Sequence, residues 1–488
     1  MELIAALWQH YFILAALLFG AMLVVSGHVL ATRSDARAAF AWLGVIWLAP
    51  AVGLALYFLF GMNRIRRRAR RVRARRGRPA RQAWLVDPDG PLLEDLMPDS
   101  LPRWRAHSRL AGRISREPPV AGNRVLPLEG GSEAYDAMIT AIDSARHSVA
   151  LTTYIFQNDR VGGRFVAALK AAVERGVAVR VLVDAVGNLY GFKPVIGALR
   201  RAGVPVARFN PARVSWRLAF FNLRTHRKMM VVDGHIGFAG GMNIRDGHLA
   251  EGHRAAQVRD THFRISGPVV AHMMDTFADD WAFATREELT GAAWFPEDAP
   301  RRPTRRDMVA RALADGPDEP VQKTSPILES ALASARKRVH IVTPYFLPEG
   351  PLVSSLSQAA LRGVRVDIIM PRRNNLVFFN LAAFAAVRPL LQSGCRIWLS
   401  DPPFDHSKLM VVDGTWSLLG SSNWDARSLK LNFEFNLEVY SRALARLLVQ
   451  RIKIRFEGAS RLTLRDLDRR SRFKRAAGRL LWLFSPYL

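Results

Sequence analysis

The chain opens with two long apolar stretches separated by a short charged segment. Residues 3–32 contain no Asp, Glu, Lys or Arg, and neither do residues 38–63. Each stretch exceeds the about 20 residues that an α-helix needs to cross the hydrocarbon core of a bilayer. A cleaved signal peptide fits this pattern poorly, because the first stretch lacks a basic start and an equally long one follows it. The pattern therefore predicts a two-helix transmembrane hairpin over residues 1–63.

The charges beside these stretches predict how the hairpin is oriented. Residues 64–81 contain eleven arginines, whereas the segment between the stretches holds only Arg33 and Arg37 with Asp35. Basic residues are retained on the cytoplasmic side of a membrane, so we expect the arginine run and everything after it to face the cytoplasm. Arginines beside a membrane helix are suited to anionic head groups, and an arm that binds nucleic acid is the alternative.

Beyond the arginines, the pattern of apolar positions occurs twice. SARHSVALTTYIF and LKAAVERGVAVRVLVDAVG in the first copy match SARKRVHIVTPYF and LSQAALRGVRVDIIMP in the second. In both copies β-rich apolar runs alternate with amphipathic helical segments, which indicates a layered α/β fold. The sequence thus predicts a basic juxtamembrane linker (64–125), a first lobe (126–286), an inter-lobe bridge (287–322) and a second lobe with a C-terminal membrane-facing tail (323–488). Packing of that tail against the lobes is the alternative.

The two copies differ by an insertion in the first. Gly203 and Gly394 are 191 residues apart, but the histidines that follow them, His226 and His406, are only 180 apart. The 11 extra residues lie in the stretch ARFNPARVSWRLAFFNLRT, which places aromatic residues among arginines. Buried core and a loop that dips into the membrane interface are both open, because short apolar runs are ambiguous.

A second repeated feature is the pattern H-x-K-x4-D. Its members are His226, Lys228 and Asp233 in the first copy and His406, Lys408 and Asp413 in the second. Residues i and i+2 of a strand share a face, so each His lies beside its Lys. An ammonium group there repels a cation, and we therefore expect no metal and no cofactor. The same pair suits a phosphate, because lysine stabilises oxyanion charge while a neutral imidazole attacks phosphorus or moves a proton.

One copy of this triplet could be two solvated side chains, but two copies in matched repeats favour chemistry. Displacement at phosphorus needs a nucleophile on one side and a proton donor on the other, and two histidines related by a pseudo-twofold axis supply both. We therefore expect each lobe to contribute half of one active site. Asp233 and Asp413 are counted with the triplets, although the glycine after each suggests a turn that the carboxylate fixes.

Further candidates follow each triplet. GGMN and GSSN place an Asn 17 residues after each histidine, and small residues allow close approach to phosphate; this gives the substrate-binding candidates Gly241, Asn243, Ser421 and Asn423. A catalytic imidazole also needs an acceptor on its second nitrogen. Asp260 and Glu434, in strand-like runs after the motifs, are the candidates, with a buried salt bridge as the alternative.

Composition adds two constraints. Seventy Lys+Arg against 42 Asp+Glu give a formal net charge of +28, so the partner is expected to be anionic, either nucleic acid or a phospholipid membrane. Because the arginines cluster beside the second apolar stretch, the membrane is favoured. The single cysteine, Cys395, excludes an intramolecular disulfide and is predicted to be a small core residue.

These residues resemble a known family. HRKMMVVD and HSKLMVVD, followed by GGMN and GSSN, resemble the paired motifs of the phospholipase D superfamily. RDTHFRISGPVV, TPYFLPEG, DARSLKLNFEFNLEVY and the terminal LLWLFSPYL are similar to bacterial cardiolipin synthases, so the resemblance covers nearly the whole chain. It implies two phospholipase D-like lobes related by a pseudo-twofold axis, in a multi-pass protein of the bacterial inner membrane.

The resemblance also implies a reaction, in which a phosphatidyl group passes from one phosphatidylglycerol to another without metal. His226 would form a phosphohistidine, and His406 would protonate the departing glycerol and then activate the second lipid. Asp260 and Glu434 would orient the histidines, and the developing charge would be neutralised by Lys228, Lys408, Asn243 and Asn423. A hydrolase, a membrane-tethered nuclease and a scaffold without activity are the rival interpretations; the expected partner is anionic phospholipid rather than nucleic acid.

Overall fold

The structure is a computed structural model that describes residues 2–32, 36–58, 102–187, 195–210, 224–249, 257–297, 308–317 and 322–483. The described residues fall into two compact units, which are the N-terminal helices up to residue 58 and a larger body from residue 102 onward. Each unit is described by itself. The aromatic residues of the insertion, Trp216, Phe220 and Phe221, lie outside the described residues.

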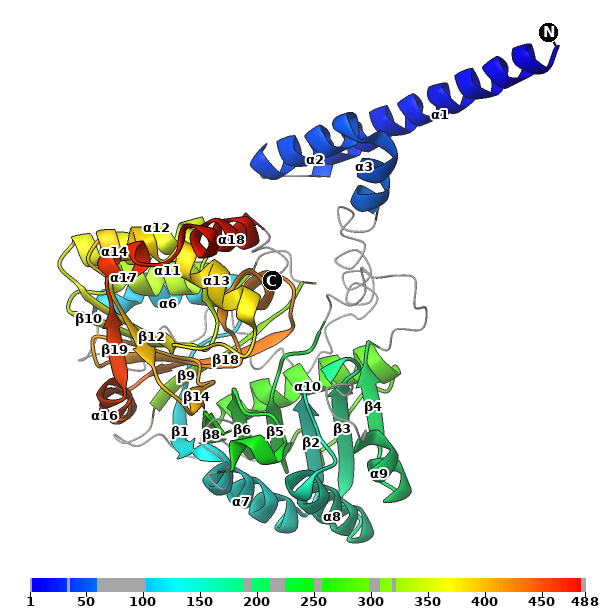
Figure 1. Cartoon of the computed structure of the whole chain (residues 1–488). Helices are drawn as coiled ribbons and strands as arrows, with labels where there is room; N and C mark the ends of the chain where they lie inside the picture. Colours follow the sequence, from blue (N-terminus) through cyan, green and yellow to red (C-terminus); the bar gives the residue numbers. More distant parts are fainter. Residues whose placement is uncertain are drawn as a thin grey trace. The chain divides into compact units, whose positions relative to one another are not determined.

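The N-terminal unit contains three helices, α1 (Glu2–Thr32), α2 (Ala36–Leu48) and α3 (Pro50–Leu56) (Figure 1). Within α1, the segment His10–Thr32 is long and apolar enough to cross a membrane, with a mean hydropathy of 2.3. The second apolar stretch is interrupted at Ala49 (φ −140°, ψ 72°), because Pro50 disfavours a helical residue before it. The predicted two-helix hairpin is therefore wrong for the described residues, which hold one helix of spanning length.

The three helices pack on one another through the second half of α1. Met22 and Val29 of α1 form a small core with Ile46 of α2 and Tyr57, which follows α3. The Tyr57 hydroxyl also lies 2.8 Å from His28 Nδ1. The first half of α1 exposes large apolar side chains, as a surface in contact with lipid would.

The body is built on one mixed sheet of fifteen strands, in the order β19-β13-β12-β10-β15-β16-β18-β9-β1-β8-β6-β5-β2-β3-β4 (Figure 1). The first half of the sheet contains β1 (Val120–Glu129), β2 (Ser148–Thr153), β3 (Ala178–Asp184), β4 (Val206–Phe209), β5 (Met229–Val232), β6 (Ile236–Gly240) and β8 (Thr261–Ser266). The second contains β9 (Met308–Asp315), β10 (Arg338–Val342), β12 (Arg365–Pro371), β13 (Arg396–Ser400), β15 (Leu409–Val412), β16 (Trp416–Gly420), β18 (Glu434–Tyr440) and β19 (Ala459–Leu462).

The pairing of the strands repeats between the halves. β2 pairs parallel with β3 and antiparallel with β5, and β10 pairs in the same way with β12 and β15. The antiparallel pair β1–β9 joins the two halves into one sheet. Two short parallel pairs lie outside it, β7 (Val258–Arg259) with β14 (Phe404–Asp405) and β11 (Phe346–Leu347) with β17 (Trp424–Asp425). The predicted α/β class with two matching lobes is confirmed.

Helices cover both faces of the sheet, and the described residues of each half contain a hydrophobic core. Those of the first half are α7 (Gly130–Asp143), α8 (Arg160–Glu174), α9 (Val195–Arg201), the short η6 (Asp246–His248) and α10 (Val269–Thr285). Those of the second are α11 (Thr324–Ser334), α12 (Gly350–Leu361), α13 (Val377–Ala386), α14 (Arg388–Gln392), α15 (Ala426–Lys430), α16 (Arg442–Glu457), α17 (Leu464–Asp468) and α18 (Arg472–Leu483). Cys395 is buried in the second core, as predicted.

Two segments predicted as linkers contribute to the body where the structure describes them. The juxtamembrane segment ends in η3 (Pro102–Trp104), α6 (Arg105–Ser115) and the start of β1, and the inter-lobe segment contains β9. His107 of α6 and Arg311 of β9 both bind the buried Glu438 of β18, at 2.7 and 2.8 Å. Flanking Pro and Arg residues hid these short elements in the sequence. The domain boundaries themselves stay predictions.

Candidate active site

The two histidines are held by crossed contacts between the lobes. The backbone N–H of His226, just before β5, donates to the carbonyl oxygen of Phe433 at 2.8 Å. In the mirror contact, the N–H of His406, just before β15, donates to the carbonyl oxygen of Arg259 at 2.7 Å. Phe433 and Arg259 each precede one of the two candidate carboxylates, so these contacts bring each histidine to the carboxylate of the other lobe.

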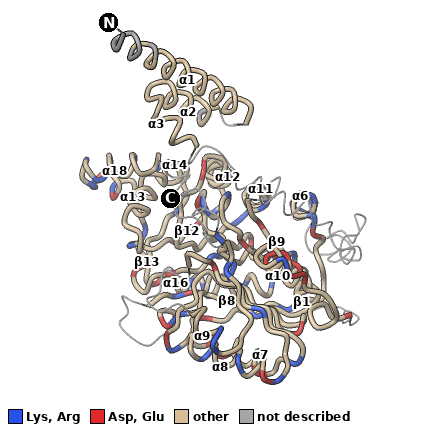
Figure 2. Tube along the Cα trace, turned by 90° about the vertical axis from the view of Figure 1, so that its right-hand side faces the viewer, with Lys and Arg blue, Asp and Glu red and all other residues tan. Residues whose placement is uncertain are grey.

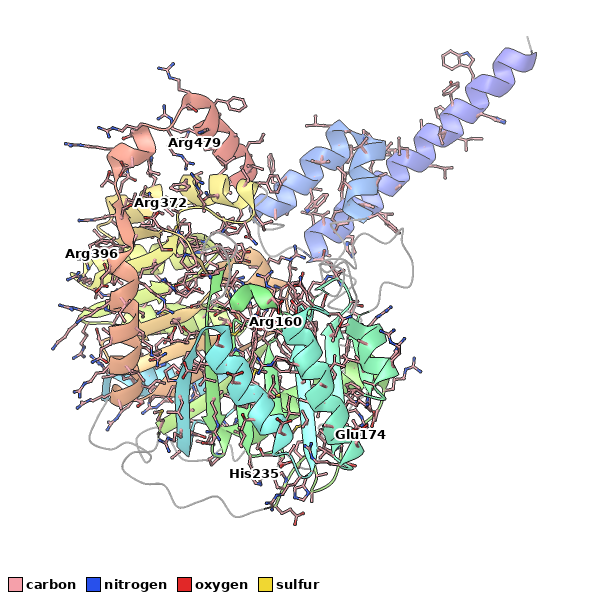
Figure 3. All side chains as sticks on the ribbon, turned by 60° about the horizontal axis from the view of Figure 1, so that its bottom comes forward. Arg160, Glu174, His235, Arg372, Arg396 and Arg479 are labelled. Carbon is pink, nitrogen blue, oxygen red and sulfur yellow. The ribbon has the colours of Figure 1, made fainter. Side chains whose placement is uncertain are left out.

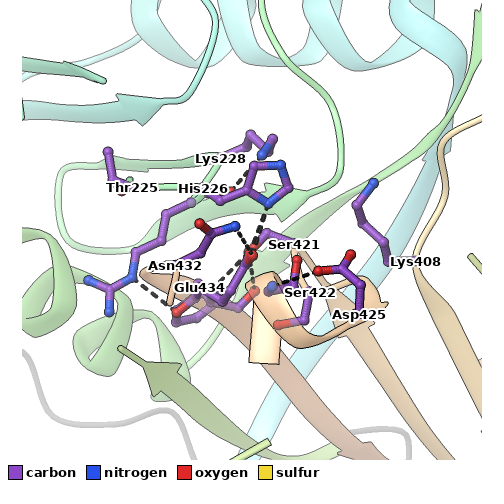
Figure 4. A network of polar contacts seen from close by, with 12 residues as sticks. Thr225, His226, Lys228, Lys408, Ser421, Ser422, Asp425, Asn432 and Glu434 are labelled. Carbon is purple, nitrogen blue, oxygen red and sulfur yellow. Dashed lines mark hydrogen bonds and ion pairs between the residues drawn. The ribbon is translucent and has the colours of Figure 1, made fainter. Parts of the chain in front are cut away.

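The side chains cross in the same way. His226 Nδ1 lies 3.0 and 3.1 Å from the carboxylate oxygens of Glu434 (Figure 4), and His406 Nδ1 lies 2.8 Å from Asp260 Oδ2. Strand pairing shows that the two carboxylates occupy matching positions. Gly240 pairs with His262, which is two residues after Asp260. In the other half, Gly420 pairs with Asn436, which is two residues after Glu434. The sequence predicted both carboxylates but not that each reaches into the opposite lobe.

Both imidazoles are largely buried, with 12% of each side chain exposed, and burial sets their protonation. It lowers the pKa of His226 to about 4, against the opposing charge of Glu434 and with the help of Lys228. Burial and Lys408 hold the pKa of His406 well below its usual range. At neutral pH each ring is therefore uncharged. With Nδ1–H donating to the carboxylate, each Nε2 keeps its lone pair, and Lys408 Nζ lies 3.1 Å from Nε2 of His406.

The carboxylate of Glu434 is surrounded by hydrogen-bond donors. It accepts from Ser421 Oγ at 2.5 Å and from Asn432 Nδ2 at 3.2 Å, besides its contact with His226 (Figure 4). Burial alone would raise the pKa of Glu434, but its contact with His226, the charge of Lys228 and the Ser421 hydroxyl lower it. Glu434 is accordingly held ionised.

Asp260 lies in a poorer environment. Among the described residues it accepts hydrogen bonds from the backbone N–H of Thr261 (2.8 Å) and from His406. Burial and the nearby Asp405 raise the pKa of Asp260 to about 8, although Lys408 opposes this. The two halves of the site thus use equivalent carboxylates with opposite shifts.

Gly241 and Ser421, predicted to bind substrate, instead lie behind these carboxylates. A Cβ on Gly241 would lie 2.7 Å from Asp260 Oδ2 and 3.0 Å from the His406 carbonyl oxygen, so only glycine fits there. The Ser421 hydroxyl, at the matching position, is engaged by Glu434 and by the N–H of Phe435 (3.0 Å). Both residues thus lie against the carboxylates, and their contact with substrate stays a prediction.

The lysines lie beside the histidines, and Asn243 and Asn423 are buried. Lys228 Nζ donates to the His226 carbonyl oxygen at 2.6 Å, and Lys408 Nζ to that of His406 at 2.5 Å. Figure 4 shows the two lysines approaching from different sides. Asn243 Oδ1 accepts from the N–H of Ile155 at 3.1 Å, which leaves its amide nitrogen to donate. These groups bring donors and positive charge to one place, as an anionic phosphate requires.

Asp233 and Asp413 lie elsewhere, and grouping them with the catalytic residues is corrected by the geometry. Asp233 accepts the backbone N–H groups of residues 146–148 at 2.7–2.9 Å, and Asp413 those of residues 336–338 at the same distances. Each aspartate directly follows its strand, β5 or β15, whereas the histidine lies before the start of that strand. Each carboxylate therefore fixes the start of the neighbouring strand, β2 or β10.

Sequence reasoning missed the rings that line the site. The Tyr154 ring lies 5.3 Å from that of His226, and the matching Tyr345 lies 6.3 Å from that of His406. The repeat held this signal, because the two tyrosines are 191 residues apart. His248, buried in η6, lies 6.4 Å from the His406 ring. It has no counterpart in the other copy, so no repeat could reveal it.

Two matched halves that each supply a His–Lys pair to one site define a phospholipase D-like protein. The chain belongs to the family described as "Cardiolipin synthase, PLD-like domain", whose model matches residues 138–281 and 328–455. Residues 16–61 match a second model, "Phospholipase_D-nuclease N-terminal". The predicted family is thereby confirmed.

Individual relatives agree with this family. Cardiolipin synthase A of Pseudomonas putida strain F1 is 33% identical over 476 residues, which cover 96% of both chains. Cardiolipin synthase of Geobacillus kaustophilus is 31% identical over 450 residues, covering 92% of this chain and 88% of the relative. The structure of a phosphatidylserine synthase from Haemophilus influenzae supports the fold, with a TM-score of 0.58 at 16% identity over 78% of this chain and 100% of that chain.

Proposed function

We propose that the protein is a phosphatidyltransferase that joins two phosphatidylglycerol molecules into cardiolipin and releases glycerol. The observation that carries this proposal is the crossed pairing of His226 with Glu434 and of His406 with Asp260, which assembles two neutral imidazoles and two buried lysines into one site. Membership of the family and the full-length similarity to cardiolipin synthases support the lipid product.

In the first step, Nε2 of His226 attacks phosphorus and forms a P–N bond while the bond from phosphorus to the glycerol oxygen breaks. Ionised Glu434 stabilises the imidazolium that results. The departing oxygen needs a proton. Because the pKa of Asp260 is raised to about 8, the His406–Asp260 pair holds one additional proton below that pH and supplies it through His406.

In the second step, His406 takes the proton from a hydroxyl of the second phosphatidylglycerol. That oxygen attacks phosphorus, the P–N bond breaks, and cardiolipin leaves His226 in its starting state. Lys228, Lys408 and the amides of Asn243 and Asn423 stabilise the phosphoryl oxygens in both steps. Ser421 and Gly241 position the carboxylates rather than touch the lipid.

We also propose that α1 anchors the protein in the bacterial inner membrane and that the body faces the cytoplasm. The length and hydropathy of His10–Thr32 support the anchor, and the arginines that follow the second apolar stretch support the orientation. The substrate lies in the same membrane, so donor and acceptor lipid need not cross water.

A product assay tests this function. Purified full-length protein is reconstituted with phosphatidylglycerol as the only phospholipid, with a chelator and no added metal. We expect cardiolipin and glycerol in equal amounts from wild type, and only trace amounts of either from His226→Ala or His406→Ala. Phosphatidic acid as the only lipid product would instead identify a hydrolase, in which water takes the place of the second lipid.

A further inference from the structure

We propose that the start of α13 and the outer face of α18 together form a docking surface for an anionic bilayer, on the side of the active site that contains His406. This α13–α18 surface consists of Leu376, Val377, Phe378, Leu480, Trp482 and Leu483, with the basic residues Arg373, Arg472, Lys474, Arg475 and Arg479 around them. The proposal rests on the proposed function only in taking a phospholipid membrane as the occupant.

The apolar part of this surface is exposed to an unusual degree. Three consecutive large residues, Leu376, Val377 and Phe378, point outward, with exposed fractions of 67% for Val377 and 58% for Phe378. On α18, Leu480, Trp482 and Leu483 are exposed as well, at 66% for Leu483. Contiguous apolar surface of this kind marks an interaction site, whereas single exposed residues do not.

The α13–α18 surface is held in place because the two helices pack closely on each other. Gly478 brings α18 against α13 so closely that a Cβ there would lie 2.6 Å from the Leu381 carbonyl oxygen. Leu481 packs on the core of the second half, and the Arg470 guanidinium lies 3.8 Å from the centre of the Phe384 ring. One face of α18 is thus committed to the body, and its other face is held outward.

The charge around the α13–α18 surface indicates its occupant. Residues 471–483 contain Arg472, Lys474, Arg475 and Arg479, all exposed, and no acidic residue. Figure 2 shows these basic positions on α18, and Figure 3 shows Arg479 at its surface. A second copy of the chain would present the same positive charge. An anionic bilayer offers head groups for the arginines and an apolar layer for Leu480 and Leu483.

Hydrogen bonds link the α13–α18 surface to the active site. Asn375, next to the exposed Leu376, accepts a hydrogen bond from the Tyr345 hydroxyl at 2.7 Å. The Tyr345 ring lies 6.3 Å from the ring of His406. Asn374 contacts the residue before Tyr345, because its Nδ2 donates to the carbonyl oxygen of Pro344 at 2.9 Å. Docking through α13 would therefore present the His406 side of the site to the head groups of the membrane.

Site-directed labelling tests the docking without relying on activity. An environment-sensitive fluorophore is attached at Val377→Cys in the full-length protein, and the buried native Cys395 is left in place. The matched control is Ile454→Cys on α16, which is similarly exposed at 63% and lies apart from α13 and α18 (Figure 1). The protein is placed in phosphatidylglycerol vesicles that contain nitroxide-labelled lipid, and in detergent.

We expect the nitroxide lipid to quench the label at position 377 at least about twofold more than the label at 454. Equal quenching at the two positions would overturn the proposal. Shielding of position 377 in detergent as well as in vesicles would also overturn it, because protein rather than lipid would then cover the surface.

A rate comparison separates this proposal from the proposed function. The variant Val377→Asp/Leu483→Glu is assayed on phosphatidylglycerol vesicles and on water-soluble short-chain phosphatidylglycerol, with Ile454→Asp as control. We expect about a tenfold loss on vesicles and a change of less than about twofold on the short-chain lipid, which reaches the site from water. Equal losses of rate on vesicles and on the short-chain lipid would contradict docking. A wild-type protein that is inactive on both substrates would contradict the proposed function. In that case the labelling experiment alone would test the docking.

Discussion

Glu434 accepts hydrogen bonds from Ser421, Asn432 and His226, whereas Asp260, at the matching position of the other half, accepts from Thr261 and His406 among the described residues. The repeat makes the backbone of the two halves alike, but the chemistry needs them to differ. One histidine must stay unprotonated to attack, and the other must deliver a proton. The surroundings of the two carboxylates supply that difference.

The largest effect is expected from removing the charge of a carboxylate. Glu434→Gln is predicted to lower kcat by about 10²–10⁴-fold, because the imidazolium of His226 loses its counter-charge. If the pairing is crossed, Glu434→Gln should add little to the loss in His226→Ala. Combined with Asp260→Asn, which affects the other histidine, Glu434→Gln should lower the rate by nearly the same factor as it does alone. Rates of cardiolipin formation from the two double variants measure this, and the opposite pattern would show that each carboxylate serves the histidine of its own lobe.

A buried glutamate outside the site separates chemistry from stability. Glu438, four residues after Glu434 on β18, binds Arg311, His107, Trp416 and Tyr440, and Glu438→Ala is expected to cost about 3–5 kcal/mol of unfolding free energy because Arg311 is left unpaired. Denaturant titration of the solubilised protein measures this.

The same residue predicts how stability depends on pH. Despite burial, Arg311 and His107 lower the pKa of Glu438 to about 2. A lowered folded-state pKa stabilises the protein above the usual carboxyl pKa of about 4.5, and this stability is lost as the pH falls from there towards 2. The loss on acidification should be smaller in Glu438→Gln; an unchanged acid limb would contradict the assignment.

The alkaline side of the activity profile tests the proton on the other half. The raised pKa of Asp260 means that its pair with His406 holds the extra proton below about pH 8 and loses it above. The rate of phosphohistidine formation should therefore fall about tenfold per pH unit above 8. In Asp260→Asn this fall should begin at lower pH, since burial lowers the pKa of His406 itself. A profile in Asp260→Asn identical in shape to wild type would remove Asp260 from the proton step.

The smallest effect is expected at the matched pair Ser421 and Gly241. Ser421→Ala removes one hydrogen bond to the charged Glu434, which amounts to about 1.5–3 kcal/mol, or roughly tenfold to a hundredfold in rate. Ser421→Thr keeps the hydroxyl and should retain more activity. If Ser421→Ala instead raises KM by a larger factor than it lowers kcat, Ser421 contacts the lipid directly.

The repeat explains how much could be predicted from sequence. The strands around each H-x-K-x4-D motif, and the candidates Asp260 and Glu434, follow from local pattern, and the structure brings all of them together. The exchange of carboxylates between the lobes depends on contacts between distant segments, such as that of His226 with Phe433, which no local pattern encodes.

Two other errors have local causes. Residues 38–63 are apolar enough to span a membrane, but Pro50 breaks this stretch into short helices. Composition averaged over residues 287–322 hid β9, an eight-residue strand between charged neighbours. The turn glycines after Asp233 and Asp413 did indicate their structural role, but the shared motif outweighed that signal.

The central claim, one composite site in which the two histidines have different roles, is tested most directly by trapping the intermediate. The protein is mixed with labelled phosphatidylglycerol, quenched in alkali within one turnover, and the modified peptide is identified by mass spectrometry. We predict phosphorylated histidine at His226, absent from His226→Ala. A phosphorylated His406, or label on both histidines of the wild-type protein, would contradict the assignment of the nucleophile to the half that contains Glu434.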